Sequence, residues 1–383
     1  MNEPWHTEDF PELRSAPPWV MQEMIQAQPA LVAELLSSPP QGTSRAAEMI
    51  GSALAAGRPV SVVGCGTSEH AAAGIAALLR AAADPQHAWL IRGRAAFAAA
   101  LEPLPGVCIA VSHDGGTRAS TLALQEAASA GAETLVITSR ANGETALAAN
   151  HVLTTPRHDE SWCHTLAYTS ALATGAALAA AAGRLAADPA SAEALLREAI
   201  STAAAADLAA GLRDRRVVLC AGVHNDHTTA RELALKIAEG SRLPTVGLEL
   251  ETVTHGQLAG QEATDGLVLV AISDHPQSAR IARRAGHVAS AAAAIGMPVM
   301  GLLSSTYADT ISPGLTSGGR VVIDLPAPDS LDGTLAGLLA GAGMLQALTL
   351  ALVHERETNP DLIRREQTPY RLAAEAAESD KRW

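Results

Sequence analysis

The chain has 383 residues, of which 48% are hydrophobic and only 3% aromatic, and its formal net charge at pH 7 is −13. This length is enough to bury two domain-sized cores, and the abundance of alanine indicates an aliphatic, helix-rich interior. The acidic balance, without a cluster of basic residues, argues against nonspecific binding to nucleic acid or to an anionic membrane, although an anionic small substrate remains compatible with a locally positive pocket.

The cysteines are widely spaced, and no CxxC pair or Cys/His spacing predicts a metal site. We expect all of them to be reduced and mostly buried; they are Cys65, Cys108, Cys163 and Cys220. The opening segment MNEPWHTEDF lacks the basic and apolar regions of a signal peptide, and the alanine-rich runs are too short and too weakly apolar to span a bilayer. We therefore expect a soluble cytoplasmic protein that needs no metal or other cofactor and has no nucleic-acid or membrane partner.

The first predicted element is a helix over residues 19–36, where apolar residues recur at helical spacing. Beyond it, short β-branched runs alternate with alanine-rich helical stretches, which is typical of an α/β fold with a parallel sheet. Helical stretches are expected near residues 164–210 and over 331–355, and the polar tail after them is either an ordered flap or a frayed end. Strands are predicted at residues 59–64, 106–112, 133–139, 151–155, 216–222, 244–250, 267–273, 298–304 and 320–325.

The second half of the chain repeats the pattern of the first. Residues 58–79 resemble 215–237, and residues 107–139 resemble 267–304, at a spacing of about 155 residues. The repeat predicts two homologous, doubly wound, parallel-sheet domains in tandem. The predicted boundaries are an N-terminal helical segment at 1–40, a first domain at 41–200, a second domain at 201–355 and a tail at 356–383.

A turn rich in small and hydroxyl residues, GCGTSEHAA (64–72), follows the first predicted strand. Gly66 permits a tight turn, and Thr67 and Ser68 place hydroxyls at the start of a helix, on the edge where open α/β sheets bind ligands. Such hydroxyls also cap helices without binding anything, and the GxGxxG fingerprint of dinucleotide sites is absent. A second turn of the same kind on a later strand favours an anion site over capping alone.

That second turn, SHDGGT (112–117), supplies Ser112, His113, Asp114 and Thr117. Its carboxylate is unexpected, because a carboxylate about 4 Å from a phosphate costs on the order of several kcal/mol unless it is protonated, paired or turned away. One explanation is that Asp114 caps the next helix and pairs with Arg118, which leaves the anion to His113 and the hydroxyls. The other is that the far end of the substrate is a neutral hydroxyl that Asp114 accepts, or a sulfonate held elsewhere.

In the second half, Glu232, Lys236 and Glu239 share a predicted helix over residues 231–240. An i,i+4 pair of Glu232 and Lys236 is an ordinary surface feature. However, Lys236 is one of only two lysines in the chain, and it stands beside two carboxylates between apolar neighbours. Downstream, His255 precedes a glycine in an otherwise uncharged stretch.

Taken together, these motifs resemble the sugar isomerase (SIS) domain family, and most of all the double-SIS isomerase half of glucosamine-6-phosphate synthase and its deglycase and deaminase relatives. GCGTSEHAA resembles the family turn GCGTSxxAA, and SHDGGTRAS resembles SxSGxTxxT. ELALKIAEG resembles EGALKLKE, and THGQLA resembles KHGPLA. The resemblance covers residues from about 20 to 355 and agrees with the two-half architecture.

The resemblance implies that a sugar phosphate is held by Thr67, Ser68, Ser112 and Thr117. It implies that Glu239 moves a proton between C1 and C2 and that His255 helps to open or protonate the sugar. An enediol route needs such a carboxylate and a second group that exchanges protons near neutrality. The resemblance further implies that Glu232 and Lys236 flank the reacting end and that the protein pairs as a homodimer.

The chain also departs from this pattern. It has no N-terminal glutaminase domain, and the lysine expected within CHTLAYTS is replaced by Leu166. The family's C-terminal lysine has no equivalent, since that segment offers Arg364, Arg365 and Thr368 instead. These departures argue against glutamine-dependent amination in this chain.

Two classes of function remain. The first is an aldose–ketose isomerase or a deglycase or deaminase, acting on a sugar that carries a 6-phosphate, a sulfonate or neither. The second is a noncatalytic sugar-sensing regulator, but the roughly 40 residues before the first strand are too few and too acidic for a DNA-binding helix-turn-helix. The presence of both Glu239 and His255 favours the enzyme.

Overall fold

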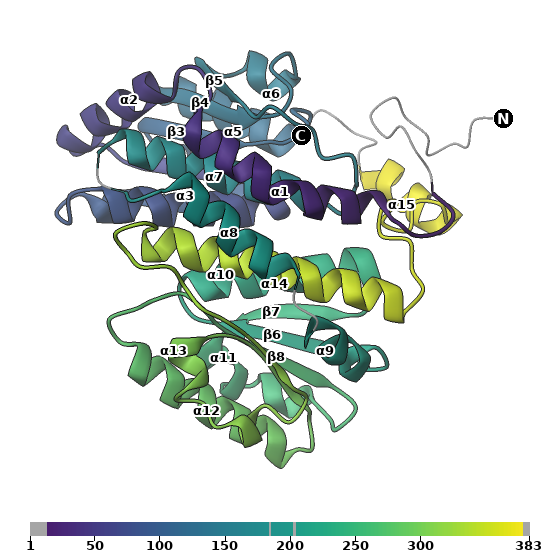
Figure 1. Ribbon diagram of the computed structural model, residues 1–383. Helices are drawn as coiled ribbons and strands as arrows, with labels where there is room; N and C mark the ends of the chain where they lie inside the picture. Colours follow the sequence, from purple (N-terminus) through teal and green to yellow (C-terminus); the bar gives the residue numbers. More distant parts are fainter. Residues whose placement is uncertain (1–13, 184, 202–203, 378–383) are drawn as a thin grey trace.

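The computed structural model describes residues 14–183, 185–201 and 204–377. Two five-stranded sheets lie one above the other in the molecule, each flanked by helices (Figure 1). Within each sheet every pairing is parallel. The strand orders, β2-β1-β3-β4-β5 and β7-β6-β8-β9-β10, are the same when each half is numbered from its own start. The predicted pair of parallel-sheet domains is therefore confirmed.

The strands of the first sheet are β1 (Val60–Gly64), β2 (Ile91–Ala95), β3 (Gly106–Val111), β4 (Ala132–Thr138) and β5 (His151–Thr154). Those of the second are β6 (Val218–Gly222), β7 (Thr245–Glu249), β8 (Gly266–Ala271), β9 (Val299–Ser304) and β10 (Arg320–Ile323). All nine predicted strands are present. The sequence did not reveal β2, an edge strand whose IRGRA composition lacks a buried apolar run.

The helices of the first half are α1 (Val20–Ser37), α2 (Thr43–Ala55), α3 (Thr67–Ala82), α4 (Ala96–Leu101), α5 (Arg118–Ser129), α6 (Glu144–Leu147), α7 (Leu166–Ala181) and α8 (Pro189–Ile200). Those of the second are α9 (Ala204–Leu212), α10 (Asn225–Lys236), α11 (Leu250–Thr254), α12 (Ser278–Ala294), α13 (Ser305–Ala308), α14 (Gly333–Glu355) and α15 (Thr368–Ala377). The helices predicted at 19–36, near 164–210 and at 331–355 correspond to α1, to α7 with α8 and α9, and to α14.

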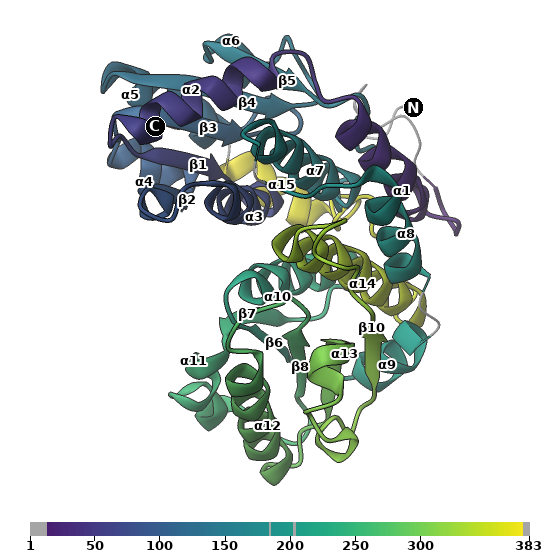
Figure 2. The same cartoon turned by 60° about the vertical axis from the view of Figure 1, so that its left-hand side comes forward.

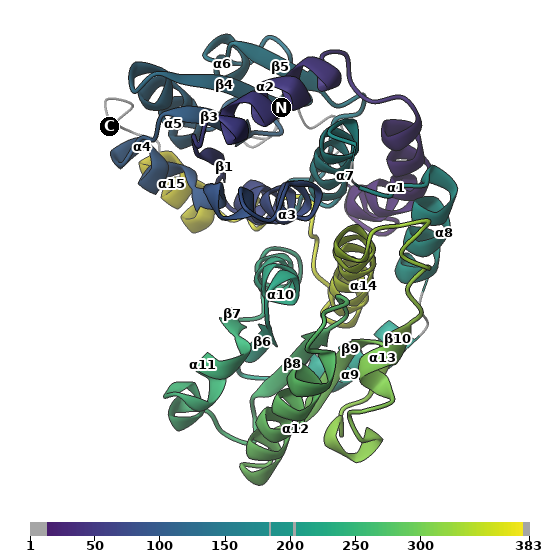
Figure 3. The ribbon, with the colours of Figure 1, turned by 90° about the vertical axis from the view of Figure 1, so that its left-hand side faces the viewer.

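The two sheets are joined by helices that belong to both halves. Helix α3 of the first half lies beside α10 of the second, and α14 runs between the two sheets (Figure 3). The main apolar core contains side chains from both halves, among them Leu172 and Leu338. The two repeats therefore bury part of their apolar surface against each other.

Helix α14 is long and apolar enough to cross a membrane by length and composition, but 83% of its most apolar window is buried inside the protein. It packs against α8, α9 and α10. Its apolar character is accounted for by this position in the core.

A glycine at the end of the first strand of each half brings strand and helix close together. A Cβ on Gly64 would lie 2.3 Å from the carbonyl oxygen of Ser68, and a Cβ on Gly222 would lie 2.4 Å from that of Asp226. Only glycine tolerates so close an approach. Both halves therefore build the same strand–turn–helix at the carboxyl end of the first strand, where doubly wound sheets bind ligands.

Candidate active site

A cavity of about 200 Å³ opens at the carboxyl ends of β1 and β3 and extends to the segment that follows α10. Its volume suits a small ligand rather than a drug-sized one. The residues that line it are Cys65, Gly66, Thr67, Ser68, His113, Asp114, Thr117, Trp162, His164 and Glu239. Seven of the eleven residues predicted from the sequence are among them.

The first turn presents two hydroxyl side chains to this cavity. Gly66, with φ of 56°, occupies the N-cap position of α3, so Thr67 and Ser68 fall in the first helical turn. No side chain caps the helix. Capping therefore does not account for these hydroxyls, and both residues line the cavity.

In the second turn, three of the four predicted residues reach the cavity. His113, Asp114 and Thr117 line it, but Ser112 is buried and its Oγ lies 3.5 Å from Thr145 Oγ1. The Asp114 carboxylate accepts a hydrogen bond from the Gly116 N–H at 3.2 Å, within its own turn. The N-cap of the following helix α5 is Thr117, so Asp114 does not cap it.

His113 is a neutral, hydrogen-bonded side chain. Its Nε2 accepts a hydrogen bond from the Asp159 N–H at 2.7 Å, and its ring stacks on His158 with a centroid separation of 4.7 Å. Burial, with His164, His158 and Arg140 nearby, lowers the pKa of His113 well below its usual value. The geometry and the pKa agree, so His113 contributes no positive charge to the cavity.

The segment from Asp159 to Ala167 forms a wall that the sequence analysis missed. The buried Asp159 carboxylate accepts hydrogen bonds from the N–H groups of Ser161, Thr165 and Ala167 at 3.2, 2.7 and 3.0 Å. It fixes the loop that carries Trp162 and His164 into the cavity. The sequence offers one sign of this loop, an acidic residue shortly before the start of a helix. That sign does not show which edge of the sheet the loop faces.

One end of the cavity is formed by Glu239, which lies in a π-helical turn (Ile237–Ser241) that continues α10. Single π-helical turns within helices are frequent at functional sites. Its side chain is 24% exposed and forms an ion pair with Lys236 Nζ, which is almost fully buried. The π turn shifts Glu239 relative to the straight helix that the sequence predicts.

Behind Glu239, titratable side chains form a buried chain across the two halves. His70 Nδ1 of α3 lies 2.6 Å from Glu232 Oε2 of α10, and Glu232 Oε1 lies 3.8 Å from Lys236 Nζ. Burial alone would raise the pKa of Glu232, but Lys236 and His70 outweigh it and lower that pKa. Burial likewise favours a lower pKa for Lys236, but Glu239 and Glu232 outweigh it and raise the pKa. Glu232 and Lys236 are therefore both ionised and hold Glu239 in place without lining the cavity.

His255 lies away from this cavity. It follows α11, its side chain is 71% exposed, and its Nε2 lies 2.9 Å from Glu251 Oε1. Within one copy of the chain it is not among the residues that meet Glu239 in the cavity. The role that the resemblance implies for His255 is not accounted for by a single chain.

The segment after α14 packs over the wall of the cavity. The Asp361 carboxylate accepts hydrogen bonds from the N–H groups of Val20 and Met21 and from the Ser161 hydroxyl. The guanidinium of Arg365 lies 4.9 Å from the centre of the Trp162 ring. Helix α15 then lies on the side of the first domain (Figure 2). The described part of the tail is therefore ordered, and a neighbouring space of about 390 Å³ between it and Glu239 is lined by Arg364 and Tyr370.

Within the described residues, no group of three or more His, Cys, Asp or Glu side chains is arranged to hold a metal ion. The four cysteines are all free, as expected; Cys65 is half-buried and the others are buried. The cavity therefore offers hydroxyls, one carboxylate bound to a lysine, one carboxylate bound to its own turn, and the rings of Trp162, His164 and the neutral His113. These groups suit hydroxyl-rich ligands and proton transfer.

Comparison with known proteins agrees with this geometry. Residues 54–183, which include both turns and the loop from Asp159, match the family described as the SIS domain. This part of the chain is a SIS domain. The chain has no match among curated protein sequences.

Solved structures extend the likeness to both halves. The C-terminal domain of glucosamine-fructose-6-phosphate aminotransferase from Francisella tularensis has a TM-score of 0.75 at 16% identity, covering 91% of this chain and 99% of that one. Tagatose-6-phosphate ketose/aldose isomerase from Escherichia coli has a TM-score of 0.72 at 16% identity, covering 92% and 97%. Glucosamine-6-phosphate deaminase from Thermotoga maritima has a TM-score of 0.64 at 16% identity, covering 89% and 96%. At such identities the likeness shows a shared fold, in which a second parallel-sheet domain follows the SIS domain.

Proposed function

We propose that this protein transfers a proton between C1 and C2 of a small sugar, with Glu239 as the group that removes and returns the proton. The supporting observation is that the Glu239 carboxylate lines the same cavity as the hydroxyls of Thr67 and Ser68, and is held there by Lys236. A carboxylate fixed at one end of a small polar cavity has the geometry that an acid–base catalyst needs. Lys236 also limits where the carboxylate moves.

Two reactions follow from this chemistry. In an aldose–ketose isomerisation, Glu239 takes the proton from one carbon, an enediol forms, and the proton returns to the neighbouring carbon. In deglycation or deamination, the same step gives an enolamine, and return of the proton to the neighbouring carbon gives an imine. Water then hydrolyses the C=N bond to a carbonyl and releases the amine or ammonia. Proteins of the shared fold include both a ketose/aldose isomerase and a deaminase.

For the substrate we propose a sugar 6-phosphate, with the hydroxyls of Thr67, Ser68 and Thr117 around the phosphate. One observation favours a second candidate, a sugar with a neutral or sulfonated far end. Asp114 lines the cavity, and the neighbouring His113 is neutral, so a phosphate there would meet a carboxylate without a compensating charge from that histidine.

We further propose a homodimer in the cytoplasm. A second copy would explain how the exposed His255 meets a cavity from which it is remote in one chain. A sensor without catalysis, the other class considered, requires tight binding without turnover.

The test combines binding, turnover and one substitution. Fructose, glucosamine and a fructosyl-amino acid, each with and without a 6-phosphate, and a 6-sulfonate sugar are compared by thermal shift, where a bound ligand stabilises by RT ln(1 + [L]/Kd). Turnover of each stabilising sugar is then followed by NMR. Glu239→Gln is expected to lower kcat by about 10²-fold or more and to leave ligand binding intact. Unchanged turnover removes Glu239 from the mechanism, and binding without turnover in the parent protein favours the sensor.

A further inference from the structure

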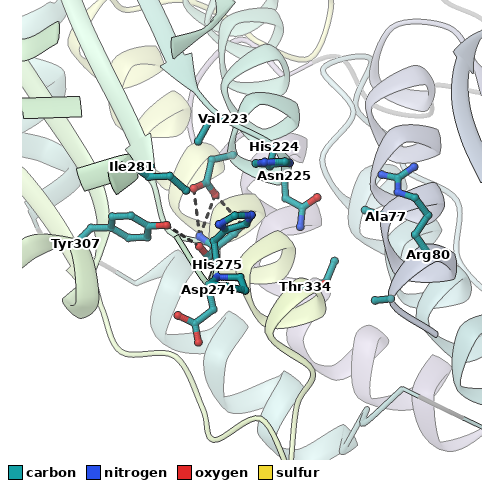
Figure 4. Close-up of a pocket in the computed structure, with 14 residues that line it drawn as sticks. Ala77, Arg80, Val223, His224, Asn225, Asp274, His275, Ile281, Tyr307 and Thr334 are labelled. Carbon is teal, nitrogen blue, oxygen red and sulfur yellow. Dashed lines mark hydrogen bonds between the residues drawn. The ribbon is translucent and has the colours of Figure 1, made fainter. Parts of the chain in front are cut away.

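A second cavity, of about 340 Å³, lies at the equivalent edge of the second domain (Figure 4). It is bounded by the turns that follow β6 and β8, which correspond to the two turns of the candidate active site. The wall on the opposite side comes from α3 of the SIS domain, at Ala77 and Arg80. The cavity is therefore closed by both halves of the molecule.

Its side chains differ from those of the first cavity. The turn after β1 has Gly66 at the N-cap of its helix, and the turn after β6 has His224 at the same position. The next residue is Thr67 in the first domain and Asn225 in the second. The rings of His224 and His275 stack with centroids 4.7 Å apart and an angle of 23° between their planes. Two imidazoles and an amide thus replace the glycine and hydroxyls of the first site.

The position of His224 is unusual for a residue with a side chain. Its φ and ψ are 53° and −123°, and those of Gly66 are 56° and −127°. This region of backbone conformation is essentially restricted to glycine, so a histidine held there is strained. Glycine would fit this turn without strain, as Gly66 does in the first domain. The histidine at this position instead adds an imidazole to the lining of the cavity.

The turn that carries His275 is rigidly held. The buried Asp226 carboxylate accepts hydrogen bonds from the N–H groups of Ile272 and Ser273 at 2.9 and 3.0 Å, and Tyr307 donates one to the Ser273 carbonyl at 3.1 Å. His275 Nδ1 accepts a hydrogen bond from the Gln277 N–H at 3.0 Å. The proton of the neutral ring is therefore on Nε2, which leaves an N–H donor for a ligand.

Across the cavity from these rings stands Arg80, which supplies a permanent positive charge (Figure 4). Its Nη1 donates to the Ile91 carbonyl at 3.2 Å, which anchors the guanidinium to the first domain. Asp274 also belongs to the lining, but its carboxylate extends away from Arg80 in Figure 4. The guanidinium of Arg80, the imidazoles opposite it and the amide of Asn225 suit a small molecule that carries both an anionic group and hydroxyls.

We propose that this cavity is a second ligand site, which takes a small hydroxylated anion such as a sugar phosphate or a sugar acid. Arg80 binds the anionic group, and Asn225, His224 and His275 bind the hydroxyls. The proposal does not depend on catalysis by Glu239, because the residues that carry it lie outside the candidate active site.

The test uses the full chain labelled with ¹³C at histidine Cε1, so that each site is observed separately. Glucose 6-phosphate, gluconate and glucose are titrated to about 10 mM, which detects even weak binding. Spectra of His224→Gly and His275→Gln assign the two signals. The phosphate and the acid are expected to shift both signals, and glucose is expected to shift them only slightly.

Two variants then test the assignment of roles. Arg80→Gln is expected to weaken the response of the two signals by about tenfold or more in Kd, and the matched surface variant Arg197→Gln is expected to leave it unchanged. His224→Gly is expected to raise the Tm of the ligand-free protein, because glycine relieves the backbone strain. The proposal is overturned if no probe shifts the signals, if glucose alone does so, or if Arg80→Gln binds as the parent does.

Signals of His113 and His164 report on the first cavity in the same titrations. Absence of turnover with shifts confined to His224 and His275 would contradict the proposed function and support the second site. Turnover together with shifts confined to His113 and His164 would support the proposed function and contradict the second site.

Discussion

At the scale of single residues, the candidate active site depends on groups whose charge is fixed by their neighbours. Lys236 is almost fully buried, yet it stays protonated because it lies between the carboxylates of Glu232 and Glu239. An ammonium without these partners would be strongly disfavoured in such a place. The rare lysine of this arginine-rich chain is thus used where a compact charge fits between two carboxylates.

His113 is the opposite case, a histidine kept neutral, and it gives a prediction about pH. Its pKa in the folded protein lies well below the value of 6.5 expected in the unfolded chain, first because of burial. As the pH falls below about 6.5, the unfolded state takes up the proton first, so the stability that His113 contributes is present above this pH and is lost below it. Each pH unit removes up to about 1.4 kcal/mol of the free energy of unfolding.

Urea unfolding between pH 7 and pH 5 measures this effect. His113→Asn is expected to reduce the dependence of the free energy of unfolding on pH by about one proton in this range. An identical pH dependence in the parent and the variant would show that His113 takes up its proton in the folded state as easily as in the unfolded chain.

At the scale of elements, helices α3 and α7 pack so closely that each places a glycine under a side chain of the other. A Cβ on Gly74 would lie 2.5 Å from Leu172 Cδ2, and a Cβ on Gly175 would lie 2.5 Å from Ile75 Cγ1. Because α3 begins with Thr67 and Ser68, this contact fixes the direction from which the hydroxyls enter the cavity.

The substitution Gly175→Ala tests the contact. Alanine favours a helix over glycine by up to about 1 kcal/mol, but the new methyl group forces Ile75 to move, and overpacking typically costs about 1–3 kcal/mol. We expect a lower free energy of unfolding in thermal or urea denaturation. In the control, Gly51→Ala in α2, no atom lies within 4 Å of the added Cβ, and we expect stabilisation by about 0.5–1 kcal/mol. Equal effects of the two changes would contradict the close packing.

The elements themselves were largely predictable, because buried parallel strands such as β3 are continuous apolar runs and stand out in the sequence. Strand β2 could not be predicted, because a strand at the edge of a sheet does not need a continuous apolar run. The turns at Thr67 and His113 were predictable as a site because carboxyl ends of parallel strands meet at one edge. The π-helical turn at Glu239 and the wall around Trp162 were not, because they depend on contacts between residues far apart in the chain.

At the scale of the whole molecule, the proposed dimer makes a specific prediction about mixed subunits. If His255 acts in the site of its partner, Glu239→Gln and His255→Asn inactivate different components of each site. A mixed dimer then holds one site with both residues intact and one with neither. Because random mixing makes half of the dimers mixed, the two inactive proteins together should recover roughly a quarter of the parent activity.

The measurement is turnover after the two variants are denatured together and refolded, with each variant refolded alone as the control. No recovery in a mixture shown to contain mixed dimers would place His255 outside the partner's site. A monomer in analytical ultracentrifugation would also contradict the proposal.

The position of α14 has a consequence for how the protein is made. The ribosome completes this helix only after it has synthesised both sheets, yet α14 packs against α3, α7 and α8 as well as α10, and its side chains belong to the core that both halves share. Until residue 355 has left the ribosome, the apolar surface of the first domain that α14 covers stays exposed. A nascent chain in this state exposes apolar surface that favours aggregation, so slower translation of the segment up to residue 355 is expected to lower the yield of folded protein.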